Sequence, residues 1–194
     1  MNRSYVWDLP TRIFHWLLVV LVSLSLYTGF VGGFEEMDWH MYSGYAILTL
    51  ILFRLAWGVF GSYNARFTTF VRGPGAIMAY VRSLRSSPPG VGHSPLGGVS
   101  VLAILLAICV QAATGLFATD DIFIEGPLVH LVSDDMSGEL TRIHNLNRWI
   151  IIALIGLHLT AIAFYQLIKT GRPVVSDDYG MEEERRRTRS AKST

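Results

Sequence analysis

The stretch "RIHNLNRWIIIALIGLHLTA" at residues 142–161 decides the fold and carries the first functional signal. It is a long apolar run with two histidines, His144 and His158, fourteen residues apart. On an α-helix this spacing is just under four turns, or about 21 Å along the axis. The two imidazoles therefore point in roughly the same direction, one near each side of a hydrocarbon core about 30 Å thick. Because ionisable side chains are costly inside a membrane, we expect both histidines to belong to a functional site.

The composition of the chain is that of a membrane protein. Of its 194 residues, 51% are hydrophobic and 16% are charged, whereas a soluble domain carries about 25% charged residues. We predict an all-α integral membrane four-helix bundle with spans at about 13–31, 39–60, 96–118 and 144–168. These spans form one transmembrane domain over residues 1–170. The polar tail, residues 171–194, has mixed charges and is predicted to be disordered.

Neither the net charge nor the cysteine content suggests another class of protein. The net charge of +1 gives no indication of a nucleic-acid partner, and we expect none. The single cysteine, Cys109, lies in an apolar run and is interpreted as a packing residue, so a disulfide or a cysteine-based metal site is not expected. The first apolar run is too long for a cleaved signal peptide and is interpreted as a retained span.

The three connectors between the spans differ in charge and in predicted structure. The segment "GGFEEMDWH" at 32–40 is predicted to be a tight acidic turn. The connector 61–95 contains arginines and no acidic residue. Its part 74–85 is predicted to be a short amphipathic helix on the membrane surface, with an ordered loop as the alternative. The connector 119–141 is acidic, and its apolar piece 127–132 is predicted to fold as a short helix.

Charge placement predicts the direction in which the chain crosses the membrane. Basic residues occur in the N-terminal lead, in the second connector and at the start of the tail: Arg3, Arg12, Arg66, Arg72, Arg82, Arg85, Lys169 and Arg172. Because cytoplasmic loops are enriched in lysine and arginine, both termini and the connector 61–95 are predicted to be cytoplasmic.

The predicted direction gives each histidine a depth. The first span runs outward, so His15 lies near the cytoplasmic face, whereas the second runs inward, so His40 lies near the outer face. The fourth span also runs inward, which makes His144 outer and His158 inner. The four histidines therefore form two depth-matched pairs, His15 with His158 and His40 with His144. His93 and His130 have no partner at their depth and are interpreted as non-ligands.

Two neutral imidazoles that face each other across a bundle suit an iron held in a porphyrin plane, and this ligation favours electron transfer. Gly29 and Gly44 suit the close approach of a flat cofactor. Arg54 lies at the depth of the inner pair and Arg12 near His15, where guanidinium groups bind haem propionates. The alternatives are that the histidines are interfacial polar residues, that the glycines serve helix packing and that Arg54 extends toward the membrane surface.

Four segments of the chain resemble a known family. They are "WDLPTRIFHW" at 7–16, "DWHMYSGYAILTLILFRLAWG" at 38–58, "GHSPLGGVSVLAILLAICVQAATGLF" at 92–117 and the helix with His144 and His158. Together they resemble the bacterial cytochrome b561-type proteins. The resemblance is strongest to the b-type cytochrome subunit of nickel–iron hydrogenases and extends to superoxide oxidase.

The resemblance implies a multi-pass protein of the bacterial inner membrane, in contact with lipid, that holds two b haems. By resemblance, their ligands are His15 with His158 and His40 with His144. Ubiquinone is expected as an exchanging redox partner, together with a periplasmic cytochrome c or a hydrogenase or dehydrogenase subunit. We expect an electron carrier rather than a self-sufficient oxidoreductase. The alternatives are a superoxide:quinone oxidoreductase and a metal transporter that uses the histidines.

Overall fold

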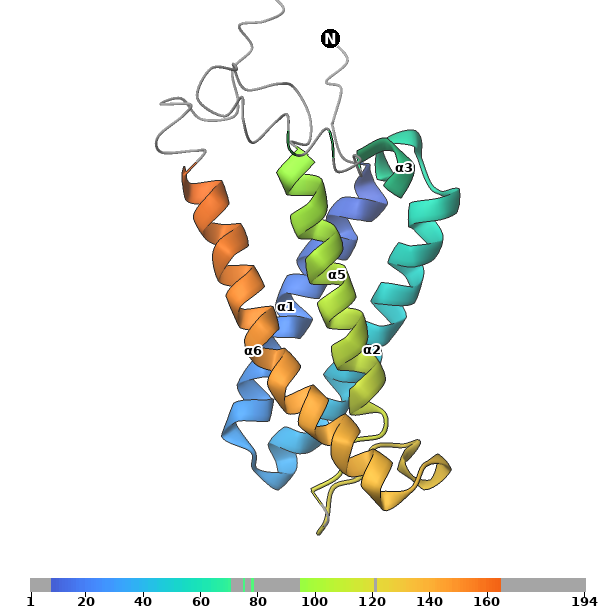
Figure 1. Cartoon of the computed structure of the whole chain (residues 1–194), viewed down its shortest axis with the longest axis vertical. Helices are drawn as coiled ribbons and strands as arrows, with labels where there is room; N and C mark the ends of the chain where they lie inside the picture. The colour runs from blue at the N-terminus through green and yellow to red at the C-terminus, as the bar shows by residue number, and fades with distance from the viewer. Residues whose placement is uncertain (1–7, 71–74, 76–77, 79–94, 121, 165–194) are drawn as a thin grey trace, which may run out of the picture. The chain divides into compact units, whose positions relative to one another are not determined.

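The computed structural model describes residues 8–70, 75, 78, 95–120 and 122–164. Four of its helices are long and apolar enough to cross a membrane: α1 (Leu9–Val31), α2 (Phe34–Phe60), α5 (Pro95–Gly115) and α6 (Asp134–Phe164). The shortest of them has 21 residues and rises about 31 Å, enough for the hydrocarbon core. The predicted all-α membrane fold is confirmed (Figure 1). The positions of both termini in the cytoplasm stay a prediction.

The turn between α1 and α2 is shorter than the sequence predicted. Helix α1 ends at Val31 and is capped by Gly32, whose φ of 70° lies in the left-handed region that favours glycine. Gly33 then caps α2, which begins at Phe34. The prediction of a tight acidic turn over 32–40 was therefore wrong. Glu35 and Glu36 lie in the first turn of α2, where carboxylates interact favourably with the helix dipole.

Helix α6 also begins earlier than predicted, and again acidic residues lie in its first turn. Its first residue is Asp134, ten residues before His144, and Asp134 and Asp135 occupy the first turn. The hydroxyl of Ser133 accepts a hydrogen bond from the backbone N–H of Met136 at 3.3 Å and caps the helix. His144 is therefore held within a regular helix instead of at its start.

The remaining connectors are described in part. The short helix predicted at 127–132 is a single 3-10 turn, Val129–Leu131, named η2. Another 3-10 turn, η1 (Tyr63–Ala65), and the short helix α3 (Phe67–Phe70) follow α2. Of the amphipathic helix predicted at 74–85, only Gly75 and Met78 are described, and both are helical. The tail 171–194 lies outside the described residues.

The core of residues 8–155 lies where the four long helices meet (Figure 1). All four contribute buried apolar side chains: Phe14 and Leu18 from α1, Ile47 and Ile51 from α2, Leu105, Ala107 and Ile108 from α5, and Ile151 from α6. Cys109 packs against this cluster. Because lipid is as apolar as these side chains, close packing and interhelical hydrogen bonds hold the helices together. Residues 156–164 belong to a second unit and are described only as the continuation of α6.

A carboxylate ties the start of α1 to the end of α2. Asp8 Oδ1 accepts the backbone N–H of Thr11 at 3.3 Å and so caps α1. Asp8 Oδ2 accepts Trp57 Nε1–H at 2.9 Å and the hydroxyl of Ser62 at 2.8 Å. Burial raises the pKa of Asp8, but the hydrogen bonds from Thr11, Ser62 and Trp57 outweigh it and hold the pKa below its usual value.

We therefore expect Asp8→Ala to lower the free energy of unfolding by about 1–2 kcal/mol at pH 7, the cost of a lost helix cap. Because the folded-state pKa of Asp8 is lowered, its contribution is present above the unfolded pKa of about 3.9 and is lost as pH falls through the folded value. Thermal unfolding in detergent, followed by circular dichroism at pH 7 and pH 3, measures both effects. Ser62→Ala removes one of the three hydrogen bonds that Asp8 accepts, and it is expected to lower the free energy of unfolding by less. If Asp8→Ala lowered the free energy of unfolding by the same amount at both pH values, the expected role of the Asp8 charge would be contradicted.

Candidate functional site

The structure brings together two of the four histidines singled out from the sequence. His40 of α2 and His144 of α6 face each other, with ring centroids 6.1 Å apart and ring planes at 81°. The two residues are far apart in the sequence, and the packing of the helices in residues 8–155 places them at one level. We call this pair the His40–His144 site.

A backbone carbonyl of α1 orients the ring of His40. His40 Nδ1 lies 2.8 Å from Ser25 O, and the hydroxyl of Ser25 lies 3.4 Å from the same nitrogen. A carbonyl oxygen can only accept a hydrogen bond, so Nδ1 carries the proton and donates it. In the neutral ring, Nε2 then keeps its lone pair. No described residue is hydrogen-bonded to Nε2 of His40, which leaves it available to a ligand.

His144 is held in the same way by α5. Its Nδ1 lies 3.0 Å from Gln111 O and 3.3 Å from the hydroxyl of Thr114. The carbonyl again identifies Nδ1 as the donor and leaves Nε2 with the lone pair. A metal-bound histidine commonly donates its other N–H to a backbone carbonyl, which sets the tautomer and the ring orientation. Both rings of the site therefore have the hydrogen-bonding pattern of metal ligands.

A glycine makes room for each ring. Four residues after Ser25 is Gly29, where an added Cβ would lie 2.9 Å from Cε1 and 3.0 Å from Nδ1 of His40. Four residues after Gln111 is Gly115, where an added Cβ would lie 2.9 Å from Cε1 and 3.2 Å from Nδ1 of His144. In a helix the residue at i+4 stands above the carbonyl of residue i. Only glycine at that position lets the imidazole reach the carbonyl at this distance.

We call the carbonyl and the glycine that receive each imidazole ring a histidine seat. The seats on α1 and α5 share a short sequence pattern that was not part of the predictions from sequence. Thr28-Gly29 lies near the end of α1 and Thr114-Gly115 at the end of α5. Both threonine hydroxyls bond back to their own helix, to Leu24 O at 2.9 Å and to Val110 O at 2.7 Å. The repeated Thr-Gly dipeptide was the available signal for Gly115. Without the structure, it could not be linked to a histidine on another helix.

Asn147 is a second residue that the sequence analysis missed. Its side chain is buried, and Nδ2 donates to Ala107 O and to Gln111 Oε1, both at 2.8 Å. Gln111 therefore joins α5 to α6 twice, through its carbonyl to His144 and through its side chain to Asn147. These interhelical bonds fix the register of α6 against α5 and hold His144 at the level of His40.

The donor set fits a metal bound between two imidazoles. Two metal–nitrogen bonds of about 2 Å each and two ring half-widths of about 1 Å place such ring centroids about 6 Å apart. The observed separation is 6.1 Å. A structural zinc site has four protein ligands and a catalytic one has three, but no group of three His, Cys, Asp or Glu side chains forms among the described residues. Two facing imidazoles instead suit a metal whose other ligands come from a macrocycle.

The other residues singled out from the sequence have varied surroundings. Gly44, one turn after His40, has open space where a Cβ would stand, which is compatible with a flat group beside the site. Arg54 is buried, donates from Nη1 to Ala65 O at 3.1 Å and lies 4.8 Å from the ring centroid of Phe67. Arg12 is exposed on α1. The roles proposed for these residues toward a cofactor stay predictions.

The second histidine pair stays a prediction. His15 is exposed in the second turn of α1, with its ring 5.4 Å from that of Trp16 at 79°. His158 lies on α6, fourteen residues after His144, in the part of the helix that belongs to the second unit. His130 lies in η2, as expected for a connector residue, and His93 lies outside the described residues.

The fold and the paired histidines together define a class of protein, the multi-pass membrane proteins with a redox centre between their helices. The comparisons with known proteins agree with this class. Residues 6–176 match the family described as prokaryotic cytochrome b561, and the chain belongs to that family. No curated protein and no solved structure matched the chain.

Membership of this family implies a b-type haem and electron transfer across the membrane. With its four apolar helices, the chain is a multi-pass protein of the bacterial inner membrane. These conclusions confirm the family, the class of cofactor and the location that the sequence predicted.

Substitution of Gly29 or Gly115 tests whether these glycines are needed for haem binding, and another glycine on α6 serves as a matched control. In Gly115→Ala or Gly29→Ala the new Cβ lies 2.9 Å from a histidine ring, so the ring must move off its carbonyl. Overpacking of this kind costs about 1–3 kcal/mol, and we expect the haem content per chain to fall. The ratio of haem to protein and the reduced α-band of the purified variants measure this effect. Gly138→Ala on α6, where a Cβ meets nothing within 4 Å, is expected to keep the wild-type haem content. Full haem content in both seat variants would contradict the role of the glycines.

Proposed function

We propose that the protein transfers electrons across the membrane through two b haems, each ligated by two histidines. His40 and His144 ligate one haem through Nε2, and His15 and His158 ligate the other. The protein exchanges these electrons between the membrane quinone pool and a partner redox protein. When bound, b haem supplies a one-electron redox centre, and two histidine ligands leave no open position for oxygen.

The geometry of the His40–His144 site is the observation that carries this proposal. The rings face each other at 6.1 Å, and each Nδ1 is within hydrogen-bonding distance of a helix carbonyl. These hydrogen bonds set the tautomer and the orientation of both rings, so that Nε2 is the atom available to iron. The polarity and the hydrogen bonds near the ligands tune the potential of the bound group.

The spacing within α6 supports a second site. His158 follows His144 by fourteen residues on one helix, an axial rise of about 21 Å. A helix that carries one ligand of each haem sets the distance between two redox centres, one near each face of the membrane. A chain with a single haem would leave His15 and His158 as ionisable groups in apolar helices without a function.

The acidic connectors support a basic protein as the redox partner. Exposed carboxylates lie at the starts of α2 and α6 and in the connector between α5 and α6: Glu35, Asp38, Asp120, Glu125, Asp134, Asp135 and Glu139. Exposed aromatic rings lie among them, with Phe34 and Phe123 at 5.6 Å. An apolar contact surrounded by negative charge suits a small cytochrome c with a basic face, since complementary charge steers the encounter.

The ligand assignment is tested by single substitutions. We expect His40→Ala and His144→Ala each to remove one haem of two and to leave the second haem spectrally intact. We expect His15→Ala and His158→Ala to remove the other haem. Quantitative haem assay of the purified variants, together with redox titration of the haem that remains, measures this outcome.

The control for these variants is His130→Ala, because His130 is an exposed histidine outside the four helices. Circular dichroism and gel filtration establish that each variant is folded. Retention of both haems in a folded His40→Ala variant would refute the assignment of His40. Loss of both haems from every folded variant would refute two independent sites.

The partner proposal predicts a dependence on salt. Electron exchange with a basic cytochrome c is expected to slow by about tenfold or more between low and physiological ionic strength, because screening removes the steering. Stopped-flow reduction measures the rate, and an acidic redox protein of similar potential serves as the control, for which added salt is expected to have no effect or to raise the rate. The combined variant Glu35→Gln and Asp38→Asn is expected to weaken the salt dependence. A rate that is independent of salt would exclude steering by these carboxylates.

A further inference from the structure

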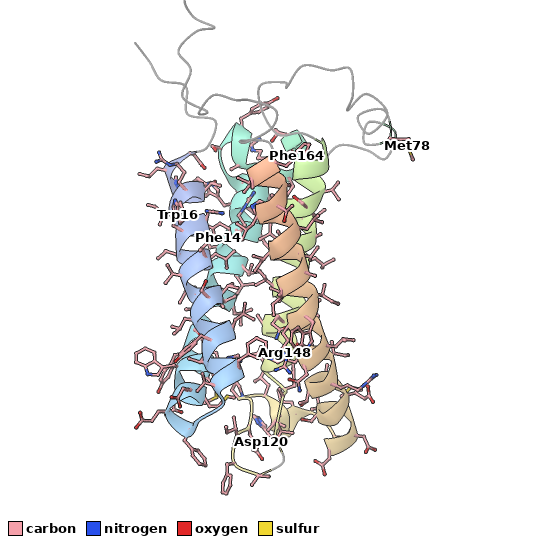
Figure 2. All side chains as sticks on the ribbon, turned by 90° about the vertical axis from the view of Figure 1, so that its left-hand side faces the viewer. Phe14, Trp16, Met78, Asp120, Arg148 and Phe164 are labelled. Carbon is pink, nitrogen blue, oxygen red and sulfur yellow. The ribbon has the colours of Figure 1, made fainter. Side chains whose placement is uncertain are left out.

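Arg148 lies beside the His40–His144 site and has no role in the function proposed so far. It follows His144 by four residues on α6, about 6 Å along the axis and about 40° around it. Its Cζ lies 5.1 Å from the ring centroid of Phe30 on α1 and 5.6 Å from that of Trp149. Figure 2 labels Arg148 on the part of α6 next to α1.

The guanidinium of Arg148 lies at the level of the two histidines. Side chains on a helix lean toward its N-terminus, so Arg148 extends back toward the turn that carries His144. The ring that it contacts belongs to Phe30, the neighbour of Gly29, and Gly29 is the seat of His40. The cation therefore lies against α1, near the seat of His40, and one helical turn from His144 on α6.

Arg148 lacks the anion that a cation at this depth needs. Its Nε is buried and has no hydrogen-bond partner. Within the part of the chain that the structure describes, no group accepts a hydrogen bond from this guanidinium, and the salt bridge found there joins Arg142 to Glu139. A guanidinium has five N–H donors and cannot lose its charge. The two aromatic rings stabilise the cation by cation–π contact but accept none of these protons in the plane of the group.

Arg54 shows the contrast within the same bundle. It is buried, whereas Arg148 is half-buried, and it too has an aromatic ring beside its guanidinium, Phe67 at 4.8 Å. Arg54, however, donates to the carbonyl of Ala65 at 3.1 Å. Among the described residues, the buried arginine thus has a protein acceptor and the half-buried one has none, although the second lies one helical turn from a histidine of the site.

We propose that Arg148 binds a propionate carboxylate of the porphyrin held between His40 and His144. This inference rests on the proposed function. The planar fork of a guanidinium matches the two oxygens of a carboxylate and forms paired, charge-assisted hydrogen bonds with it. Phe30 and Trp149, whose ring centroids lie 5.6 Å apart, both contact the guanidinium and restrict where it can lie before a carboxylate binds.

This arrangement has a consequence for the potential of the haem at this site. A fixed positive charge favours the reduced form, which carries one more electron, and it also neutralises the propionate. Removal of Arg148 takes away the cation and leaves the carboxylate uncompensated, and both changes disfavour reduction. The midpoint potential of this haem therefore falls, and the potential becomes dependent on pH as the uncompensated carboxylate titrates.

The test is a redox titration of purified, full-length Arg148→Gln, Arg148→Lys and Arg142→Gln. For Arg148→Gln we expect the equilibrium constant for reduction of one haem to fall about tenfold, which is about 59 mV for one electron, with the second haem unchanged. Arg148→Lys keeps the charge without the fork and is expected to show a smaller fall. Arg142→Gln, the exposed and salt-bridged control, is expected to match the wild type.

Other outcomes would overturn the proposal or separate it from the proposed function. A folded Arg148→Gln protein with both haems and unchanged midpoint potentials would refute the proposal. A wild-type midpoint potential that changes with the concentration of added acetate would also refute it, because Arg148 would then bind an anion from solvent. If Arg148→Gln does not accumulate, an Arg148→Lys potential equal to that of the wild type at every pH between 6 and 8 would refute it as well. His40→Ala decides the ligand assignment independently, because that variant tests the presence of the haem and not its potential.

Discussion

The hydrogen bond from each histidine Nδ1 to a helix carbonyl is the interaction on which the described site depends. It requires three features at once: a ring on one helix, a carbonyl on the neighbouring helix, and a glycine four residues after that carbonyl. A carbonyl within a helix already accepts a backbone N–H, so the imidazole uses its second lone pair. Any side chain larger than hydrogen at Gly29 or Gly115 would occupy the position of the ring.

This requirement explains the arrangement of the bundle. Helix α1 orients a histidine of α2, and α5 orients a histidine of α6, so each pair of helices has one histidine and one seat. The two pairs then meet with the rings 6.1 Å apart. Asn147 and Gln111 fix the register of the second pair through hydrogen bonds within the apolar interior, where water does not compete with them. A half-buried arginine without an anion is costly among these apolar helices, and the proposal that Arg148 binds a carboxylate rests on this cost.

Much of the fold could be predicted because apolar runs of the right length become helices in a bilayer. The errors lay at the starts of α2 and α6, where carboxylates suggested a loop. Glu35, Glu36, Asp134 and Asp135 are polar, but the N-terminus of a helix favours negative charge. For the site, the fourteen-residue spacing and the charge of the connectors were enough to predict that His40 and His144 share one level. Gly115, Gln111 and Asn147 were not predicted, because their roles depend on which residue of another helix lies opposite them.

The sequence by itself determined the class of the protein, its four apolar helices and its family, because hydropathy and periodicity are properties of each segment alone. The tertiary structure decided which groups orient those histidines. It placed Ser25 O against His40 and Gln111 O against His144, and it left the guanidinium of Arg148 in contact with two aromatic rings. The rotation and register of each helix against its neighbours select such partners. The energies that set them come from contacts between segments distant in the chain, which no pattern within a single helix records.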